Sequence, residues 1–163
     1  MTKPPRNVGL GEIVVSCDPE DILVAYGLGS CVAVGLWDSK RRIGGMLHAV
    51  LPERNNGADV LSGKFVDSGI AGLLNAVERI GAERRQLTVW MAGGANMLVN
   101  TSLGQAYEIG TRNIQAACQT LQRLGLHLRA KQVGGNSGRT VQLYVMEGRM
   151  TVRTVGGKEM DLD

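Results

Sequence analysis

The segment from residue 22 to residue 37 reads ILVAYGLGSCVAVGLW, two apolar runs joined by Gly27-Leu28-Gly29-Ser30. Short runs that are rich in valine, leucine and aromatic side chains favour β-strands. Glycine at the junction permits the positive φ angles and the close backbone approach of a tight turn. We therefore predict strands over 22–26 and 31–37, connected by this turn, and a fold that is built around a sheet.

Apolar segments on both sides of this pair predict further strands. These are expected over 9–16, 43–50, 87–91, 126–131, 141–145 and 150–155. Glu147-Gly148 would join the last two segments as a hairpin. Residues 53–63 are expected to form a polar loop, and residues 156–163 a short polar tail.

Two amphipathic helices are predicted between these strands. The first has an apolar stripe at helical spacing, formed by Val66, Ile70, Leu73, Val77 and Ile80, and would end at Gly81. The second carries Ile114, Ala117, Leu121 and Leu124, and would extend from an N-cap at Thr111 to Gly125. The order of elements predicts a single α+β domain over 1–163, with its core at about 8–156 and largely antiparallel sheets covered by the two main helices.

The composition of the chain excludes several classes of protein. Its 163 residues are 44% hydrophobic, which is typical of a globular domain, and its net charge of +3 gives no electrostatic footprint for nucleic acid. No segment is long and apolar enough for membrane insertion, and no export signal is visible at the N-terminus. Three cysteines without a CxxC pair fit a reducing compartment, so we expect a cytoplasmic protein.

Cys31 and His48 are the candidate catalytic residues. Cys31 follows the glycine-containing turn, where a nucleophile can meet its substrate and nearby backbone N–H groups can stabilise an oxyanion. His48 interrupts an apolar run, so its imidazole must be hydrogen-bonded or functional. The residues alone leave two interpretations open, a catalytic pair or a structural cysteine beside a satisfied core histidine. Further ligands at metal-binding spacing are missing, so neither a metal nor a cofactor is expected.

Five sequence blocks together resemble the CheD family, the chemoreceptor glutamine deamidases of bacterial chemotaxis. They are Gly27-Leu28-Gly29-Ser30-Cys31-Val32-Ala33-Val34, His48-Ala49-Val50-Leu51-Pro52, Ala92-Gly93-Gly94-Ala95 with Met97, Ile109-Gly110-Thr111-Arg112-Asn113, and Gly134-Gly135-Asn136 with Gly138-Arg139. The resemblance covers roughly residues 8–156. It implies a fold similar to the catalytic domain of cytotoxic necrotizing factor toxins.

The resemblance also implies an activity, a site and partners. The activity is hydrolysis of glutamine side-chain amides on the cytoplasmic domain of chemoreceptors, and some members of the family are assigned activity on methyl esters. Cys31 would be the nucleophile and His48 the general base. Gly29 and Ser30 are expected to form or shape the oxyanion site. Asn136 and Arg139 would either hold the substrate or shape a loop through hydrogen bonds. A further implied partner is the CheC phosphatase.

Ala25 departs from the family pattern, which commonly has a catalytic threonine at this position. Three alternatives follow: a backbone carbonyl orients His48, a side chain such as Ser30 or Tyr26 does so, or catalysis is weakened. The last alternative would leave a regulatory binding module instead of an efficient enzyme. A thiol redox protein is a further alternative, and it would need Cys17 close to Cys31.

Overall fold

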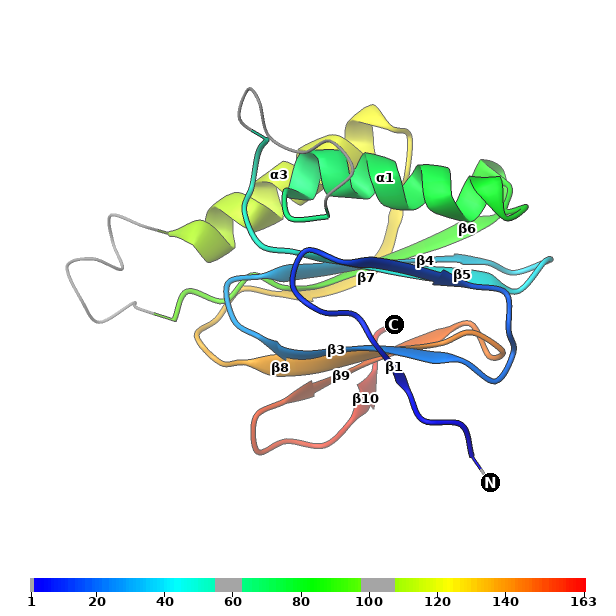
Figure 1. The fold of residues 1–163 in the computed structure, drawn as a ribbon. Coiled ribbons are helices and arrows are strands. Elements are labelled where there is room, and N and C mark those ends of the chain that lie inside the picture. The colour runs from blue at the N-terminus through cyan, green and yellow to red at the C-terminus, as the bar shows by residue number, and fades with distance from the viewer. Residues whose placement is uncertain (1, 55–62, 98–107) are drawn as a thin grey trace.

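The computed structural model describes residues 2–54, 63–97 and 108–163, which form three layers (Figure 1). Two β-sheets pack face to face, and two helices cover the outer face of one of them. Most of the loop expected over 53–63 lies outside the described residues. Neither helix of the described part is long and apolar enough to cross a membrane.

Each sheet has five strands. The first contains, in spatial order, β1 (Arg6–Asn7), β3 (Ile22–Leu28), β8 (Arg139–Tyr144), β9 (Arg149–Thr154) and β10 (Met160–Asp161). The second contains β2 (Ile13–Ser16), β5 (Ile43–Ala49), β4 (Val32–Asp38), β6 (Leu87–Gly93) and β7 (Leu128–Val133). Among these strands β1/β3 and β6/β7 pair in parallel and the other neighbours are antiparallel, as the predicted α+β fold requires.

The central strand β4 is buried on both faces, which explains its continuous apolar sequence. Val32, Val34 and Leu36 face the helices, whereas Ala33 and Trp37 face the first sheet. The predicted pair of strands 22–26 and 31–37 exists, but its members belong to different sheets. The apolar pattern could not distinguish these arrangements, because a strand under a helix and a strand under a second sheet need the same side chains.

The helices α1 (Val66–Arg79) and α3 (Ile109–Arg123) pack on the second sheet, and a short 3-10 helix, η1 (Arg84–Gln86), precedes β6. The apolar stripe predicted for α1 is buried, except that Ile80 caps the helix and stays 41% exposed. Gly81 follows with a φ of +114°, as its predicted role requires. The predicted N-cap of α3 was wrong: the cap is Glu108, and Thr111 lies in the first turn.

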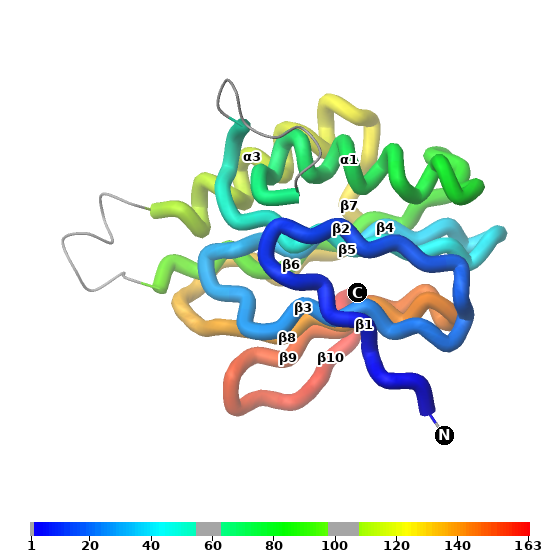
Figure 2. Tube along the Cα trace, in the orientation of Figure 1, coloured from blue at the N-terminus to red at the C-terminus, as the bar shows by residue number. Residues whose placement is uncertain are grey.

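Both ends of the chain add an edge strand that the sequence analysis did not predict. Figure 2 shows the N-terminal segment passing from β1 in the first sheet to β2 in the second. The turn Gly9–Glu12 shortens the strand expected over 9–16, because the backbone N–H of Glu12 donates to the carbonyl of Gly9 (3.0 Å). In the expected polar tail, Met160 of β10 pairs with Val152 of β9. Strands of two residues are too short to show an alternating pattern.

Candidate active site

Cys31 lies where the chain passes from one sheet to the other. β3 belongs to the first sheet and β4 to the second, so Gly29-Ser30-Cys31 crosses between them at one end of the sandwich (Figure 1). Two backbone hydrogen bonds hold this crossing. The N–H of Ala95 donates to the carbonyl of Gly29 (2.8 Å), and the N–H of Gly94 donates to that of Cys31 (2.8 Å). The segment that follows β6 therefore fixes the position of Cys31.

Gly93 permits the close approach of that segment. Its φ is +110°, and a Cβ at this position would collide with the carbonyl oxygen of Cys31. Because the obstacle is backbone and cannot rotate away, any side chain at Gly93 would displace Cys31. Gly93, which belongs to one of the five blocks that resemble the family, is thus a packing requirement of the candidate site.

His48 lies in β5 and is held by the segment from Val8 to Glu12. The backbone N–H of His48 donates to the carbonyl of Glu12 (3.1 Å), and its carbonyl accepts a hydrogen bond from the N–H of Gly11 (2.8 Å). The imidazole Nδ1 lies 2.9 Å from the carbonyl oxygen of Val8. The side chain is buried, with only 3% of its surface exposed. Two backbone hydrogen bonds and one ring contact to the same segment fix the position of His48.

The contact with Val8 determines the tautomer of His48. A carbonyl oxygen only accepts hydrogen bonds, so Nδ1 must carry the proton and donate it to Val8. The neutral ring therefore has its lone pair on Nε2. This nitrogen is buried and has no hydrogen-bond partner in the described part of the chain. His48 is consequently prepared to accept a proton at Nε2.

Cys31 and His48 project from the same face of the second sheet. Ala33 pairs with His48 across β4 and β5, and Cys31 lies two residues before Ala33. Such diagonal neighbours are separated by about 7–8 Å along the sheet, within reach of long side chains. Cys31 also packs against the apolar cluster between the two sheets, the face on which His48 contacts Val8.

The thiol of Cys31 is neutral in this arrangement. Burial raises the pKa of the Cys31 thiol, and the backbone N–H of the same residue opposes this rise only in part. Since Nε2 of His48 has no partner among the described residues, the structure contains no preformed ion pair between the two side chains. Chemistry at Cys31 therefore requires removal of its proton when substrate is bound, a step that His48 could perform.

Asn113 connects the two segments that carry these residues. Its side-chain amide nitrogen, Nδ2, donates to the carbonyl of Ser30 (2.8 Å) and to that of Val50 (3.0 Å). Ser30 directly precedes Cys31, and Val50 lies two residues after His48. Asn113 is fully buried in the first turns of α3. From the sequence, Asn113 was visible only as part of a block that resembles the family, because its partners lie far away in the sequence.

The remaining predicted site residues divide into two groups. Gly29 and Ser30 lie in the crossing beside Cys31. Arg139 is buried at the start of β8, where it donates to the backbone carbonyl (2.7 Å) and side-chain oxygen (2.8 Å) of Gln132 and to the carbonyl of Gly134. Asn136 is exposed in the loop between β7 and β8. For Arg139 the contacts are those of a loop-shaping side chain, one of its two predicted alternatives.

The structure also distinguishes among the alternatives for Ala25. Ala25 is fully buried between the sheets, whereas Tyr26 is 57% exposed. The group that contacts Nδ1 of His48 is the carbonyl of Val8. Val8 in turn donates its own N–H to the carbonyl of Val24 (2.7 Å), next to Ala25. A backbone carbonyl therefore orients His48, and no hydroxyl at position 25 is needed for this purpose.

Cys17 does not approach Cys31. Cys17 precedes β3 and Cys31 follows it, so the seven residues of this strand separate them by about 23 Å. Cys17 is exposed, Cys118 lies on α3 and packs partly buried against the core, and all three cysteines are free thiols. The arrangement offers Cys31 no resolving cysteine for redox chemistry.

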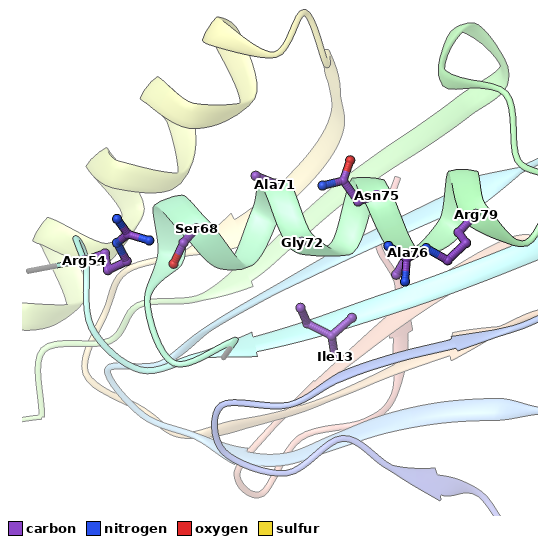
Figure 3. Close-up of a pocket in the computed structure, with 8 residues that line it drawn as sticks. All are labelled: Ile13, Arg54, Ser68, Ala71, Gly72, Asn75, Ala76 and Arg79. Atoms are coloured by element: carbon purple, nitrogen blue, oxygen red, sulfur yellow. The ribbon is translucent and has the colours of Figure 1, made fainter. Parts of the chain in front are cut away.

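A hollow of about 370 Å³ lies elsewhere, along α1 (Figure 3). It is lined by Ile13, Arg54, Ser68, Ala71, Gly72, Asn75, Ala76 and Arg79. It contains no thiol, imidazole or carboxylate, so its lining offers neither a cysteine nucleophile nor a general base for its Ser68 hydroxyl. The candidate site is thus defined by Cys31 and His48 at the end of the sandwich.

Comparison with known proteins gives consistent matches. The family model described as CheD chemotactic sensory transduction matches residues 50–154, a range that begins just after His48. The chain is 42% identical over 157 residues to the probable chemoreceptor glutamine deamidase CheD of Symbiobacterium thermophilum, with 95% of each chain covered. It is 39% identical over 159 residues to the protein of the same name from Pyrococcus abyssi, with 94% of this chain and 93% of that protein covered.

A solved structure, the hypothetical protein YfiH of Bacillus licheniformis, is a much more distant match. It is 12% identical, with a TM-score of 0.35, and the alignment covers 66% of this chain and 46% of that one. A similarity this low does not indicate a shared fold.

Proposed function

The chain belongs to the CheD family, and from this premise we propose that it is a chemoreceptor glutamine deamidase, a protein-glutamine glutaminase, that uses Cys31 and His48. It hydrolyses side-chain amides of receptor glutamines to glutamate and ammonia. The observation that carries the assignment of the two residues is the hydrogen bond from Nδ1 of His48 to Val8, which leaves Nε2 as a base on the face that carries Cys31.

In the first half of the reaction, Nε2 of His48 takes the proton of the Cys31 thiol as its sulfur attacks the amide carbon. A carbon–sulfur bond forms, and the carbonyl oxygen becomes an oxyanion. Backbone N–H groups of the crossing from Gly29 to Cys31 stabilise this charge, an effect worth about 3–4 kcal/mol per donor. The imidazolium then gives its proton to the amide nitrogen, ammonia leaves, and a thioester remains.

In the second half, water hydrolyses the thioester. His48 removes a proton from the water as its oxygen attacks the thioester carbon, and then returns that proton to the departing Cys31 sulfur. The products are glutamate and the original thiol, so the enzyme is restored without a cofactor. The carbonyl of Val8 stabilises the imidazolium in both halves, because it remains the acceptor for Nδ1–H throughout.

Three finer predictions accompany this proposal. The enzyme acts in the cytoplasm on the cytoplasmic domain of its receptor. It binds a phosphatase of the CheC type. Its fold is similar to the catalytic domain of the cytotoxic necrotizing factors. Each follows from the resemblance stated above and remains a prediction.

The alternative of a regulatory module without efficient catalysis depended on Ala25. Catalysis would be weakened only if His48 lost its orientation when position 25 has no hydroxyl. The contact between His48 and Val8 preserves this orientation, because the backbone supplies the acceptor. The enzyme is therefore the better supported of the two functions.

The proposal is tested with a purified cytoplasmic fragment of a chemoreceptor from the same organism. The fragment is incubated with the protein, and conversion of glutamine to glutamate is mapped by peptide mass spectrometry. We expect conversion at discrete sites, its loss with Cys31→Ala, and a decrease of about 100- to 10,000-fold with His48→Gln. Cys17→Ala is the matched control and should retain full activity, because Cys17 is exposed and remote. A fragment that binds the protein but gains no glutamate would favour the regulatory module.

A further inference from the structure

Large apolar side chains are exposed around the end of the sandwich that carries Cys31. Tyr26 is 57% exposed, Met97 is 52% exposed and Val155 is 79% exposed. They come from three separate parts of the chain: the end of β3, the segment after β6, and the residue after β9. Exposed apolar residues that gather beside a reactive group are typical of an interaction surface.

Met97 is in direct contact with the crossing that holds Cys31. A Cβ placed on Gly29 would lie 3.3 Å from Cγ of Met97, so this side chain packs against the glycine. The same segment donates the backbone hydrogen bonds from Gly94 and Ala95 that fix the crossing. Met97 thus forms one border of the candidate site and is still half exposed.

Val155 borders the crossing from the other sheet. A Cβ on Gly138 would lie 3.6 Å from Cγ2 of Val155 and 3.7 Å from the carbonyl oxygen of Leu28. The N–H of Val155 also donates to the carbonyl of Gly138 (3.1 Å). Val155 is therefore connected through Gly138 to Leu28, the residue before Gly29. Tyr26 lies two residues before Leu28 on the same strand.

We propose that Tyr26, Met97 and Val155 form an apolar rim that binds apolar side chains of the polypeptide substrate next to its target glutamine. This inference rests on the proposed function. A glutamine side chain that reaches Cys31 brings its own backbone to the end of the sandwich, so the flanking residues must cross the rim. Methionine suits such a surface, because its flexible thioether adapts to different partners.

The rim contributes to binding of the substrate and takes no part in the chemical steps. Met97 packs against Gly29 from outside and the three rim side chains are exposed, whereas the imidazole that moves protons, His48, is buried. Shortening a rim residue should therefore weaken binding of the receptor fragment and leave the reactivity of Cys31 toward small molecules unchanged. That separation makes the rim testable independently of turnover.

The chain offers a matched control at the opposite end of the sandwich. Met146 is 55% exposed, close to the value for Met97. It follows the C-terminal end of β8, where Tyr144 pairs with Ile22. The other end of β8 pairs with Leu28. The six residues of this strand place Met146 about 20 Å from the rim. Met97→Ala and Met146→Ala remove the same side chain with a similar exposure at different places.

The test measures the dissociation constant of the receptor fragment by calorimetry in a Cys31→Ala background, where no turnover occurs. We expect Met97→Ala and Val155→Ala each to raise Kd about fivefold, and Met146→Ala to leave it unchanged. In protein that retains Cys31, Met97→Ala should not alter the rate of alkylation of Cys31 by iodoacetamide.

Three results would contradict the proposal that the rim binds the substrate. The first is that the receptor fragment does not bind the Cys31→Ala protein, and the second is that the Met97→Ala and Met146→Ala variants have equal Kd values. The third is that Met97→Ala slows the alkylation of Cys31 in proportion to the loss of binding. The last would mean that Met97 positions Cys31 and does not contact substrate. Absence of glutamate with the unmodified protein would instead contradict the proposed function, and the Kd values would still decide whether the rim binds the receptor.

Discussion

The carbonyl oxygen of Val8 accepts a hydrogen bond from Nδ1 of His48 at 2.9 Å, and this contact joins the N-terminal segment to the candidate general base. Val8 has no polar side chain, so the sequence contains no direct sign of its role. The contact depends on β1, whose pairing with β3 brings Val8 to the space between the sheets. An edge strand of two residues thereby sets the tautomer of a histidine forty residues away.

Restoring a threonine at position 25 should not improve the enzyme. The carbonyl of Val8 already accepts the hydrogen bond from Nδ1 of His48. Because Ala25 is fully buried, the larger threonine side chain would overpack the space between the sheets. We expect Ala25→Thr to lower the free energy of unfolding by about 1–3 kcal/mol and to leave the deamidation rate unchanged or reduced. Denaturant titration and the receptor assay measure these two quantities.

Ala92→Thr is the control for overpacking alone, because Ala92 is equally buried in the same cluster. Both variants should lose stability to a similar extent. If Ala25→Thr increased the deamidation rate tenfold or more while Ala92→Thr did not, the carbonyl of Val8 would be an inadequate substitute for the hydroxyl.

The fold class was predictable from the sequence because long elements show their periodicity. The stripe of α1 and the apolar runs of β3 and β4 indicated the correct element types. The division into two sheets was not predictable, since β3 and β4 look like the two strands of one hairpin although they pair with different partners. The local hydrophobic pattern indicates which residues are buried, but it does not indicate which helix or sheet covers them.

The candidate site was predictable only where side chains carry the chemistry. Cys31 and His48 could be selected because a thiol after a glycine turn and an imidazole in an apolar run are unusual. The carbonyl of Val8 could not be selected, because every residue has a carbonyl. Asn113 was equally hidden, since its partners Ser30 and Val50 are more than sixty residues away.

Asp21 should make the free energy of unfolding depend on pH in the acid range. Burial alone would raise the pKa of Asp21, but hydrogen bonds from Lys3, Ser16 and Arg6 outweigh it and hold the pKa at about 2, below the ordinary 3.8. A lowered pKa in the folded state stabilises the protein above the ordinary value. This contribution should therefore decrease as the pH falls from about 4 to about 2.

Asp21→Asn should flatten this part of the stability profile, measured by chemical denaturation at several pH values. We expect it to lower the free energy of unfolding by about 1–3 kcal/mol at neutral pH, because Asp21 is buried and bonds Ser16 at 2.5 Å. Glu20→Gln removes an exposed neighbouring carboxyl and should change little. A profile for Asp21→Asn that keeps the original slope between pH 4 and pH 2 would contradict this assignment.

Gly93 should be intolerant of any side chain, for a reason specific to the site. Both Gly93→Ala and Gly125→Ala place alanine at a positive φ, +110° and +72° respectively, and both should lose stability from strain. A Cβ at Gly125 meets open space, whereas a Cβ at Gly93 collides with the carbonyl of Cys31. We expect deamidation to fall at least tenfold in Gly93→Ala beyond any change in Gly125→Ala, measured where both variants are folded. Equal rates would show that Cys31 tolerates displacement.

Asn113 should position Cys31 and His48 relative to each other. Asn113→Ala removes the donor to the partly buried carbonyls of Ser30 and Val50, at a cost of about 1–3 kcal/mol for each acceptor left without a partner. We expect a large decrease in kcat and a slower alkylation of Cys31, with little change in KM. Ala117→Gly destabilises the same helix at a fully buried position one turn further along, without removing a hydrogen-bond donor, and it should leave both rates unchanged.

Asn113→Asp distinguishes a positioning role from a merely structural one through its pH dependence. An ionised carboxylate would face the same two carbonyl oxygens, which repel it and raise its pKa. When the pH falls, the carboxyl takes up a proton and regains one O–H donor, so one of the two hydrogen bonds can form again. The activity of Asn113→Asp, relative to the unmodified protein, should therefore recover in part as the pH decreases, while that of Asn113→Ala should not. Parallel pH profiles for the two variants would mean that the donor to Ser30 and Val50 does not control the geometry of the site.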